Sequence, residues 1–242
     1  MDVFDDLAAE HAQLEAMLHT LTAEQWLSPS AAPGWTIADV VLHLAQTEEN
    51  SPLTATAADE PGWREGDDQI DDMIEEWVRS ERDDPPVIFG RWQRAHRAAV
   101  ATLRSADPER KLRWAAAPLK PATLATTRIA EHWAHAQDIA VPLGFDYPDT
   151  DRLRHIAWLG VSTLPYAFGL EGIDPQPVFV ELTSPSGETW TFGDPEAPTH
   201  ISGTASEFCR IGARRLAPED CSVVATGPFA TQALRLLRNY AR

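Results

Sequence analysis

The sequence has 242 residues, a length that suits one large domain or two small ones. Hydrophobic residues make up 43% of it, enough for a packed core, and charged residues make up 24%, which is ordinary for a globular protein. The formal net charge of −17 opposes binding to nucleic acids or anionic membranes, because both are negatively charged. No apolar run approaches the ~20 residues of a membrane-spanning helix.

The N-terminus and the cysteines predict a cytoplasmic location. The first residues are acidic and lack the basic start and apolar core of a signal peptide. The two cysteines, Cys209 and Cys221, form no Cys-x-x-Cys pair, which suits a reducing compartment. We therefore expect a cytoplasmic monomer or homodimer whose partners are small molecules, with no nucleic acid and no membrane among them.

The N-terminal part is predicted to be helical. Apolar residues recur at helical spacing over 2–22, and Thr36 can cap a second helix that runs from 37 to about 50, with Asp39 placed to complete a capping box. The connection 51–68 is long for a helical bundle, so it is a candidate flap over a site. Further helices are predicted at 69–81, 85–105, 122–141 and 149–168.

The pattern changes after Gly172. Apolar and polar residues alternate over 178–182 and 189–193 around a Ser-Pro-Ser-Gly turn, which predicts a β-hairpin. Two more strands, at 200–204 and 222–226, and two helices, at 205–216 and 228–241, are predicted to follow. The change of period predicts an α+β protein of two domains, a helical domain at 1–172 and a smaller α+β domain at 173–242.

The helix at 122–141 carries a stripe of ionisable residues. Glu131 and His135 are four residues apart, Asp138 is seven residues after Glu131, and Arg128 is three residues before it. This spacing places all four on one face of an α-helix. A Glu and a His one turn apart can bind one metal ion, whereas the alternative is an ordinary solvated face.

His43, on the second helix, is the candidate third ligand. A single histidine among apolar neighbours is more often a core residue with a hydrogen-bond partner. Facing helices of a bundle, however, commonly build metal sites, and three protein ligands leave a position open for substrate. Two His and one Glu favour Zn²⁺ and also admit Ni²⁺, Co²⁺ or Fe²⁺. His132 points about 100° away from His135, so we expect it to be exposed or structural.

Two segments resemble the DinB-like, mycothiol-dependent maleylpyruvate isomerase family, and the resemblance extends over most of the chain. They are Pro33-Gly34-Trp35-Thr36-Ile37-x-Asp39-Val40-Val41-x-His43-Leu44-Ala45 and Arg128-x-x-Glu131-x-x-x-His135-x-x-Asp138. The resemblance implies an N-terminal four-helix bundle that holds a divalent metal, a smaller C-terminal α+β domain, and mycothiol as the thiol cosubstrate. The metal ligands that it implies are His43, Glu131 and His135.

The resemblance also implies catalytic groups. Asp138 matches an acidic position near the metal that matters for activity, although it can equally serve to orient a ligand. The family places an arginine of the C-terminal domain over the site, and Arg214 and Arg215 both match it. By default the two arginines are a cation cluster at the end of a helix. The Arg-Arg pair differs from the Gly-Arg ending of the characterised isomerases, so the substrate does not carry over.

The leading functional hypothesis is a metal- and mycothiol-dependent enzyme, an isomerase or a thiol transferase. Its substrate would be a small electrophile that bears a carboxylate. One alternative is a metal-assisted hydrolase, in which water and not thiol attacks. Another is a non-catalytic protein that binds metal or a small ligand.

Overall fold

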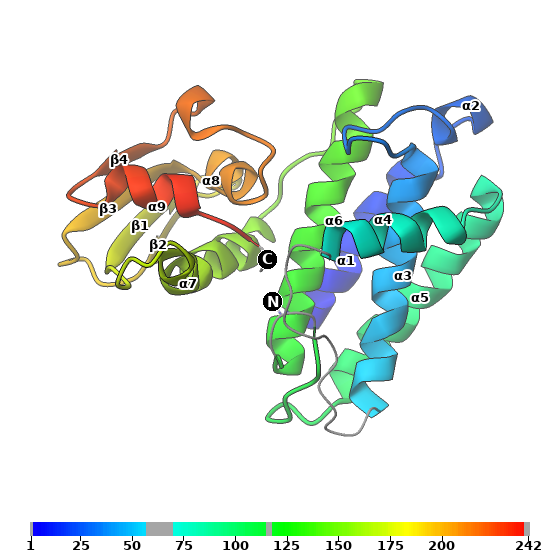
Figure 1. Ribbon diagram of the computed structural model, residues 1–242, viewed down its shortest axis with the longest axis horizontal. Helices are drawn as coiled ribbons and strands as arrows, with labels where there is room; N and C mark the ends of the chain where they lie inside the picture. The colour runs from blue at the N-terminus through cyan, green and yellow to red at the C-terminus, as the bar shows by residue number, and fades with distance from the viewer. Residues whose placement is uncertain (1, 57–69, 115–117, 240–242) are drawn as a thin grey trace. The chain divides into compact units, whose positions relative to one another are not determined.

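The computed structural model describes residues 2–56, 70–114 and 118–239. The chain forms two compact units, Met1–Tyr147 and Pro148–Ala241 (Figure 1). The first is helical and the second combines helices with a sheet, which confirms the predicted mixture of helical and α+β parts. Among the described residues, no helix has both the length and the apolar character needed to cross a membrane.

The first unit contains six described helices. They are α1 (Val3–Leu18), α2 (Ala23–Trp26), α3 (Ile37–Thr56), α4 (Ile70–Ser80), α5 (Pro85–Ser105) and α6 (Pro121–Leu143). The long helices α1 and α3 each pack against both α5 and α6, which also contact each other (Figure 1). Their shared core holds leucines with no exposed surface and two buried tryptophans, Trp92 and Trp133.

Local sequence signals set the ends of these helices. The Thr36 amide donates to Asp39 Oδ2 at 2.9 Å and the Asp39 amide donates to Thr36 Oγ1 at 3.2 Å, which confirms the capping box before α3. Pro121 lies in the first turn of α6, and Gly144 ends that helix with φ 65°, a left-handed conformation that favours glycine. Helix α3 continues to Thr56, beyond its expected end near residue 50. The predicted flap from residue 57 onward lies outside the described residues.

In its described residues, the second unit is a mixed four-stranded sheet with three α-helices and one 3-10 helix, Pro218–Asp220. Its elements are α7 (Leu153–Leu170), β1 (Val178–Thr183), β2 (Thr189–Phe192), β3 (Thr199–Thr204), α8 (Ala205–Gly212), β4 (Val224–Thr226) and α9 (Ala230–Leu236). The strand order is β2-β1-β3-β4. Strands β1 and β2 form the predicted antiparallel hairpin, β1 and β3 are parallel, and β3 and β4 are antiparallel.

The division between the units differs from the predicted boundary at residue 172. It falls between Tyr147 and Pro148, so α7 belongs to the second unit. The reason is packing: α7 contacts α8, α9 and β2 through its buried side chains, which include Ile156, Leu164 and Phe168. The change from helical to strand period marks the first strand of a unit, and that unit begins with a helix.

Candidate functional site

The structure brings the three predicted ligands together. His43 lies on α3, whereas Glu131 and His135 lie on α6, which packs against α3. His43 Nε2 is 3.1 Å from Glu131 Oε1, and the ring centroids of His43 and His135 are 5.0 Å apart. One nitrogen or oxygen from each residue lies within 4.8 Å of the other two. The i, i+4 spacing on α6 and the packing of two helices therefore make one three-residue cluster.

The cluster is partly open to solvent. The side chain of His43 is 8% exposed and that of His135 is 14% exposed, but that of Glu131 is 27% exposed. The indole of Trp35 lies against both imidazoles, with ring centroids 5.2 Å from His43 and 6.4 Å from His135. Glu131 is therefore the most exposed member of the cluster, while Trp35 forms an apolar wall against the two histidines.

Asp138 is bonded to one of the candidate ligands. Its Oδ2 lies 2.9 Å from Nδ1 of His135, and the residue is buried. A carboxylate at this distance favours the tautomer that carries hydrogen on Nδ1, which leaves the lone pair of Nε2 free to bind a ligand. The backbone oxygen of Asp138 also accepts a hydrogen bond from the Ala31 amide at 2.8 Å, which ties the loop before α3 to α6.

Arg128 is fully buried and pairs with two carboxylates. Its Nε donates to Glu48 Oε1 at 2.7 Å, its Nη2 donates to Thr47 Oγ1 at 2.8 Å, and its Nη1 donates to Glu131 Oε2. Arg128 thus bridges Glu48 and Glu131. Burial alone would raise the pKa of Glu131, but the Arg128 charge and the hydrogen bond from His43 outweigh it and hold that pKa well below its usual value.

Burial also decides the charge of His43. It lowers the pKa of the imidazole, and the hydrogen bond to Glu131, which acts in the opposite direction, does not restore it. His43 is therefore neutral at pH 7, the protonation state that a metal ligand requires. An anionic Glu131 and a neutral His43 are the protonation states in which both can bind a cation.

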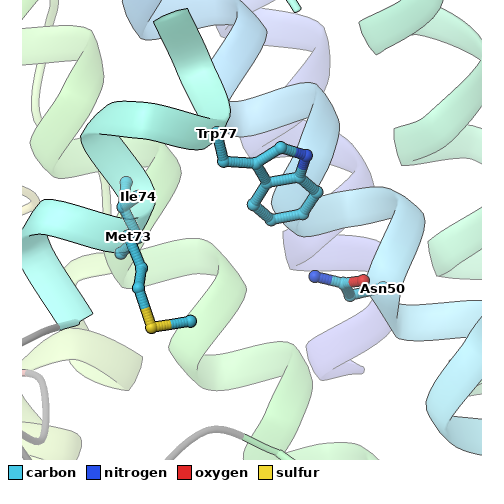
Figure 2. Close-up of a pocket in the computed structure, with 4 residues that line it drawn as sticks. All are labelled: Asn50, Met73, Ile74 and Trp77. Atoms are coloured by element: carbon cyan, nitrogen blue, oxygen red, sulfur yellow. The ribbon is translucent and has the colours of Figure 1, made fainter. Parts of the chain in front are cut away.

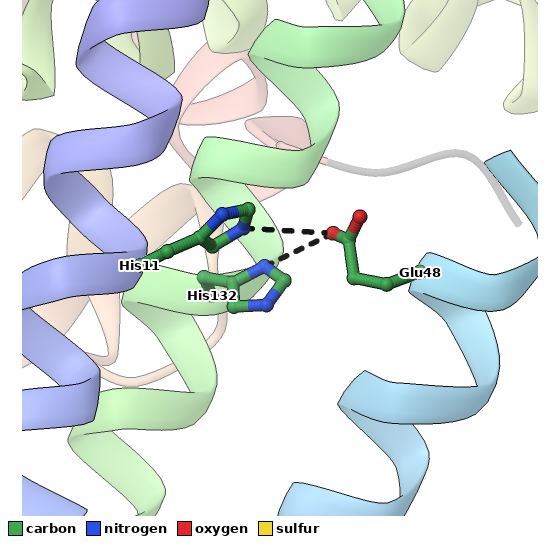
Figure 3. Close-up of side chains that lie close together, drawn as sticks. All are labelled: His11, Glu48 and His132. Carbon is green, nitrogen blue, oxygen red and sulfur yellow. Dashed lines mark ion pairs between the residues drawn. The ribbon is translucent and has the colours of Figure 1, made fainter. Parts of the chain in front are cut away.

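A second cluster, formed by His11, Glu48 and His132, is buried between α1, α3 and α6 (Figure 3). Its side chains are no more than 1% exposed, so the alternative that His132 is exposed is wrong, and the expectation that it is structural stays a prediction. Glu48 Oε1 lies 3.7 Å from His11 Nε2 and 3.5 Å from His132 Nδ1. The sequence signal for His11 was its helical spacing from Leu7 and Leu14, which places it on the buried face of its helix.

An apolar pocket lies between α3 and α4 (Figure 2). Asn50, Met73, Ile74 and Trp77 line it, and none of them belongs to either cluster. The indole of Trp77 donates to Glu81 Oε1 at 2.9 Å, which fixes the ring as one wall. The pocket can accept an apolar group and offers no acid, base or nucleophile among these four residues.

Arg214 and Arg215 lie in the second unit, directly after α8. Arg214 Nη1 donates to the Arg235 backbone oxygen at 3.0 Å, and Arg215 Nη1 donates to that of Ala213 at 2.6 Å. Arg214 has φ 61°, a left-handed conformation common after a helix end. The catalytic roles predicted for the two arginines rest on the family resemblance and stay predictions.

A comparison with known proteins decides the family. Residues 7–140 match the model of the mycothiol maleylpyruvate isomerase N-terminal domain. The chain belongs to the mycothiol maleylpyruvate isomerase family. Two uncharacterized proteins of Mycobacterium tuberculosis, from strains CDC 1551 / Oshkosh and ATCC 25618 / H37Rv, are each 36% identical to it over 250 residues, which cover 98% of this chain and 94% of theirs.

Solved structures agree with this family at the level of the fold. A crystal structure of the mycothiol-dependent maleylpyruvate isomerase matches with a TM-score of 0.61 at 14% sequence identity, and that of a histidine-to-alanine mutant of the enzyme matches with a TM-score of 0.59 at 12%. Each match covers 93% of this chain and 91% of the other. The shared fold thus extends beyond the N-terminal family domain into the second unit.

Proposed function

We propose that this member of the mycothiol maleylpyruvate isomerase family is a metal-dependent enzyme that uses the thiol of mycothiol on a small electrophile. The observation that carries the proposal is the His43, Glu131 and His135 cluster, inside the region that matches the family model. We also propose that α1, α3, α5 and α6 are the DinB-like four-helix bundle, which their mutual packing supports.

The donor set fits a divalent cation. Bonds of about 2.0–2.2 Å to tetrahedral Zn²⁺ place its ligand atoms roughly 3.3–3.6 Å apart, and His43 Nε2 and Glu131 Oε1 are already 3.1 Å apart. His43 Nδ1 is buried and finds no hydrogen-bond partner within the described part of the chain, so this ring is held by packing and by Glu131. Two imidazoles and one carboxylate favour Zn²⁺ and admit Ni²⁺, Co²⁺ or Fe²⁺.

Each residue of the site is proposed to have its own role. A divalent cation, when bound, lowers the pKa of a coordinated thiol and so supplies the reactive thiolate at neutral pH. Glu131 contributes the negative charge, His43 and His135 contribute neutral nitrogens, and Asp138 holds the proton on His135 Nδ1. Trp35 shields the two imidazoles from water on one side.

The thiolate has two routes to product. In an isomerase it adds to a polarised carbon–carbon double bond; the resulting single bond rotates, and loss of the thiolate restores the double bond. In a transferase the thiolate displaces a leaving group, which departs with the electron pair of the broken bond, and the thioether is the product. A carboxylate on the substrate is proposed from the family resemblance.

Metal analysis tests the proposal. The purified wild-type protein is expected to hold about one divalent ion per chain, and His43→Ala and His135→Ala are expected to lose it, since each removes one of three ligands. Equal, near-zero metal in all three proteins after growth in metal-supplemented medium would refute the site. His155→Ala is the control, because His155 lies in the second unit and outside both clusters.

Thiol dependence tests the chemistry separately. Turnover of an unsaturated dicarboxylate or a haloalkane is expected only when mycothiol and metal are both present. Activity that survives without any thiol would indicate the metal-assisted hydrolase, in which water attacks. Stabilisation by metal without turnover across a broad panel of electrophiles would indicate a binding protein.

A further inference from the structure

The second cluster, formed by His11, Glu48 and His132, has the composition of a metal site, but the nitrogens of its His132 are already hydrogen-bonded. The indole nitrogen of Trp92 lies 3.1 Å from His132 Nε2, and an indole N–H can only donate, so Nε2 must accept. The hydrogen of His132 is then on Nδ1, where it donates to the Arg128 backbone oxygen at 3.0 Å. Both nitrogens of His132 are therefore occupied, and neither is free to bind a metal.

Glu48 in the same cluster is paired through one of its two carboxylate oxygens. Its Oε1 accepts from Arg128 Nε at 2.7 Å, and both residues have no exposed surface. Arg128 connects this buried pair to the candidate metal ligands, because its Nη1 donates to Glu131. The guanidinium of Arg128 thus joins Glu48 of the second cluster to Glu131 of the first.

The charges show what this connection does. One guanidinium is shared by two carboxylates, Glu48 and Glu131, so the buried group keeps one net negative charge. Without Glu48, Glu131 would be the only carboxylate paired with Arg128. The most stable arrangement of the two would then be a pair in which both Glu131 oxygens accept from the guanidinium. Such a pair would draw both Glu131 oxygens toward Arg128 and away from His43.

We propose that Glu48 is a positioning residue that acts through Arg128. By binding Arg128, it keeps Glu131 directed at His43 and leaves the negative charge of Glu131 available to a metal ion. This inference rests on the proposed metal site and deepens it. Thr47 supports the same arrangement, because its hydroxyl accepts from Arg128 Nη2 and fixes the plane of the guanidinium. His11 and His132 lie beside Glu48, and neither Glu48 nor Arg128 has exposed surface, so the pair is kept from water.

The test compares two isosteric substitutions on the same helix. Glu48→Gln removes the buried charge that opposes Arg128. Asp39→Asn removes a buried charge that pairs with Arg82 at 2.7 Å, and Asp39 is a member of neither cluster. Both are expected to lower the Tm. Only Glu48→Gln is expected to weaken Zn²⁺ binding, by roughly 10–100-fold, the range typical of residues that hold a metal ligand in place.

The measurement is the Kd for Zn²⁺ alone, by competition with a chelating dye. A wild-type Kd in Glu48→Gln, or an equal loss in Asp39→Asn, would overturn the proposal, since the effect would then be absent or general. Glu48→Asp retains the charge and is expected to recover part of the affinity. If Glu48→Gln does not fold, Thr47→Val decides: a several-fold weaker Kd supports the positioning role, and an unchanged Kd overturns it.

Failure of the proposed metal site can be distinguished from failure of the positioning role of Glu48. If the wild-type protein binds no divalent cation, the proposed function is wrong, and the positioning role is judged on crystal structures of metal-free wild type and Glu48→Gln. Glu131 turned from His43 onto Arg128 in the variant supports the role. Glu131 still in hydrogen-bond contact with His43 overturns it.

Discussion

At the scale of single residues, the two histidine clusters differ in what their nitrogens do. In the second cluster both nitrogens of His132 are occupied, by Trp92 and by the Arg128 backbone. In the first, the hydrogen bond that His135 makes to Asp138, at 2.9 Å, is through Nδ1. Composition and proximity make both clusters candidates for metal binding, and hydrogen-bond direction separates them.

Asp138→Asn tests whether Asp138 orients a ligand or takes part in the reaction. The amide keeps the shape but loses the charge that favours hydrogen on His135 Nδ1, so Zn²⁺ affinity is expected to fall by roughly 10–100-fold. If Asp138 only orients His135, kcat per bound metal stays near wild type when metal is saturating. A kcat that remains low with metal fully bound would show that its carboxylate acts on the thiol or the substrate.

His96, which is not one of the candidate metal ligands, is expected to make the free energy of unfolding depend on pH. Burial, followed by the nearby His11, lowers the pKa of His96 to about 4, whereas the unfolded value is near 6.5. Between these values the unfolded chain binds a proton that the folded protein does not, so the free energy of unfolding falls as the pH falls from about 6.5 toward 4. At pH 4 this difference in pKa lowers the free energy of unfolding by about 3 kcal/mol.

His96→Phe is expected to remove this part of the pH dependence. Its stability relative to wild type should rise between pH 7 and pH 4.5, as measured by urea denaturation at several pH values. His19→Phe is the control, because the His19 side chain is 60% exposed. Parallel pH profiles for wild type and His96→Phe would contradict the assignment.

At the scale of elements, local sequence signals predicted where helices lie better than they predicted which elements contact one another. The pattern over 85–105 gave both ends of α5, since Pro85 and Pro86 open it and its apolar stripe faces the core. Helix α2 was missed, because four residues are too few to show a period, although Thr22 and Gln25 form a capping box. The parallel pairing of β1 with β3 has no local signature, because it depends on which strands meet in space.

The capping box before α3 carries an element-scale prediction. Thr36→Ala removes the hydroxyl that accepts from the Asp39 amide, and is expected to lower the free energy of unfolding by about 1 kcal/mol. The matched control is Thr127→Ala within α6, whose hydroxyl bonds the Leu124 backbone oxygen of its own helix. That control is expected to be neutral or slightly stabilising, since alanine favours a helix interior.

At the scale of the whole molecule, the candidate site was partly visible in the sequence. His43, Glu131 and His135 were predicted as a set, because one-turn spacing and two family-like segments identify them without knowledge of the fold. Glu48 and His11 were not, because they meet only when α1, α3 and α6 pack together. The unit boundary was misplaced for the same reason: α7 has the pattern of any buried helix, and only its contacts assign it to the sheet.

This assignment makes a prediction about fragments. Residues 148–242 retain α7 and are expected to fold alone with a cooperative urea transition, because the apolar face of α7 covers α8 and α9. Residues 173–242 lack it and would expose the core side chains Phe208 and Leu237, which have no exposed surface in the intact unit. The shorter fragment is therefore expected to show no cooperative transition and poorly dispersed NMR spectra. A folded 173–242 fragment would restore the boundary at 172 and make α7 an independent connecting helix.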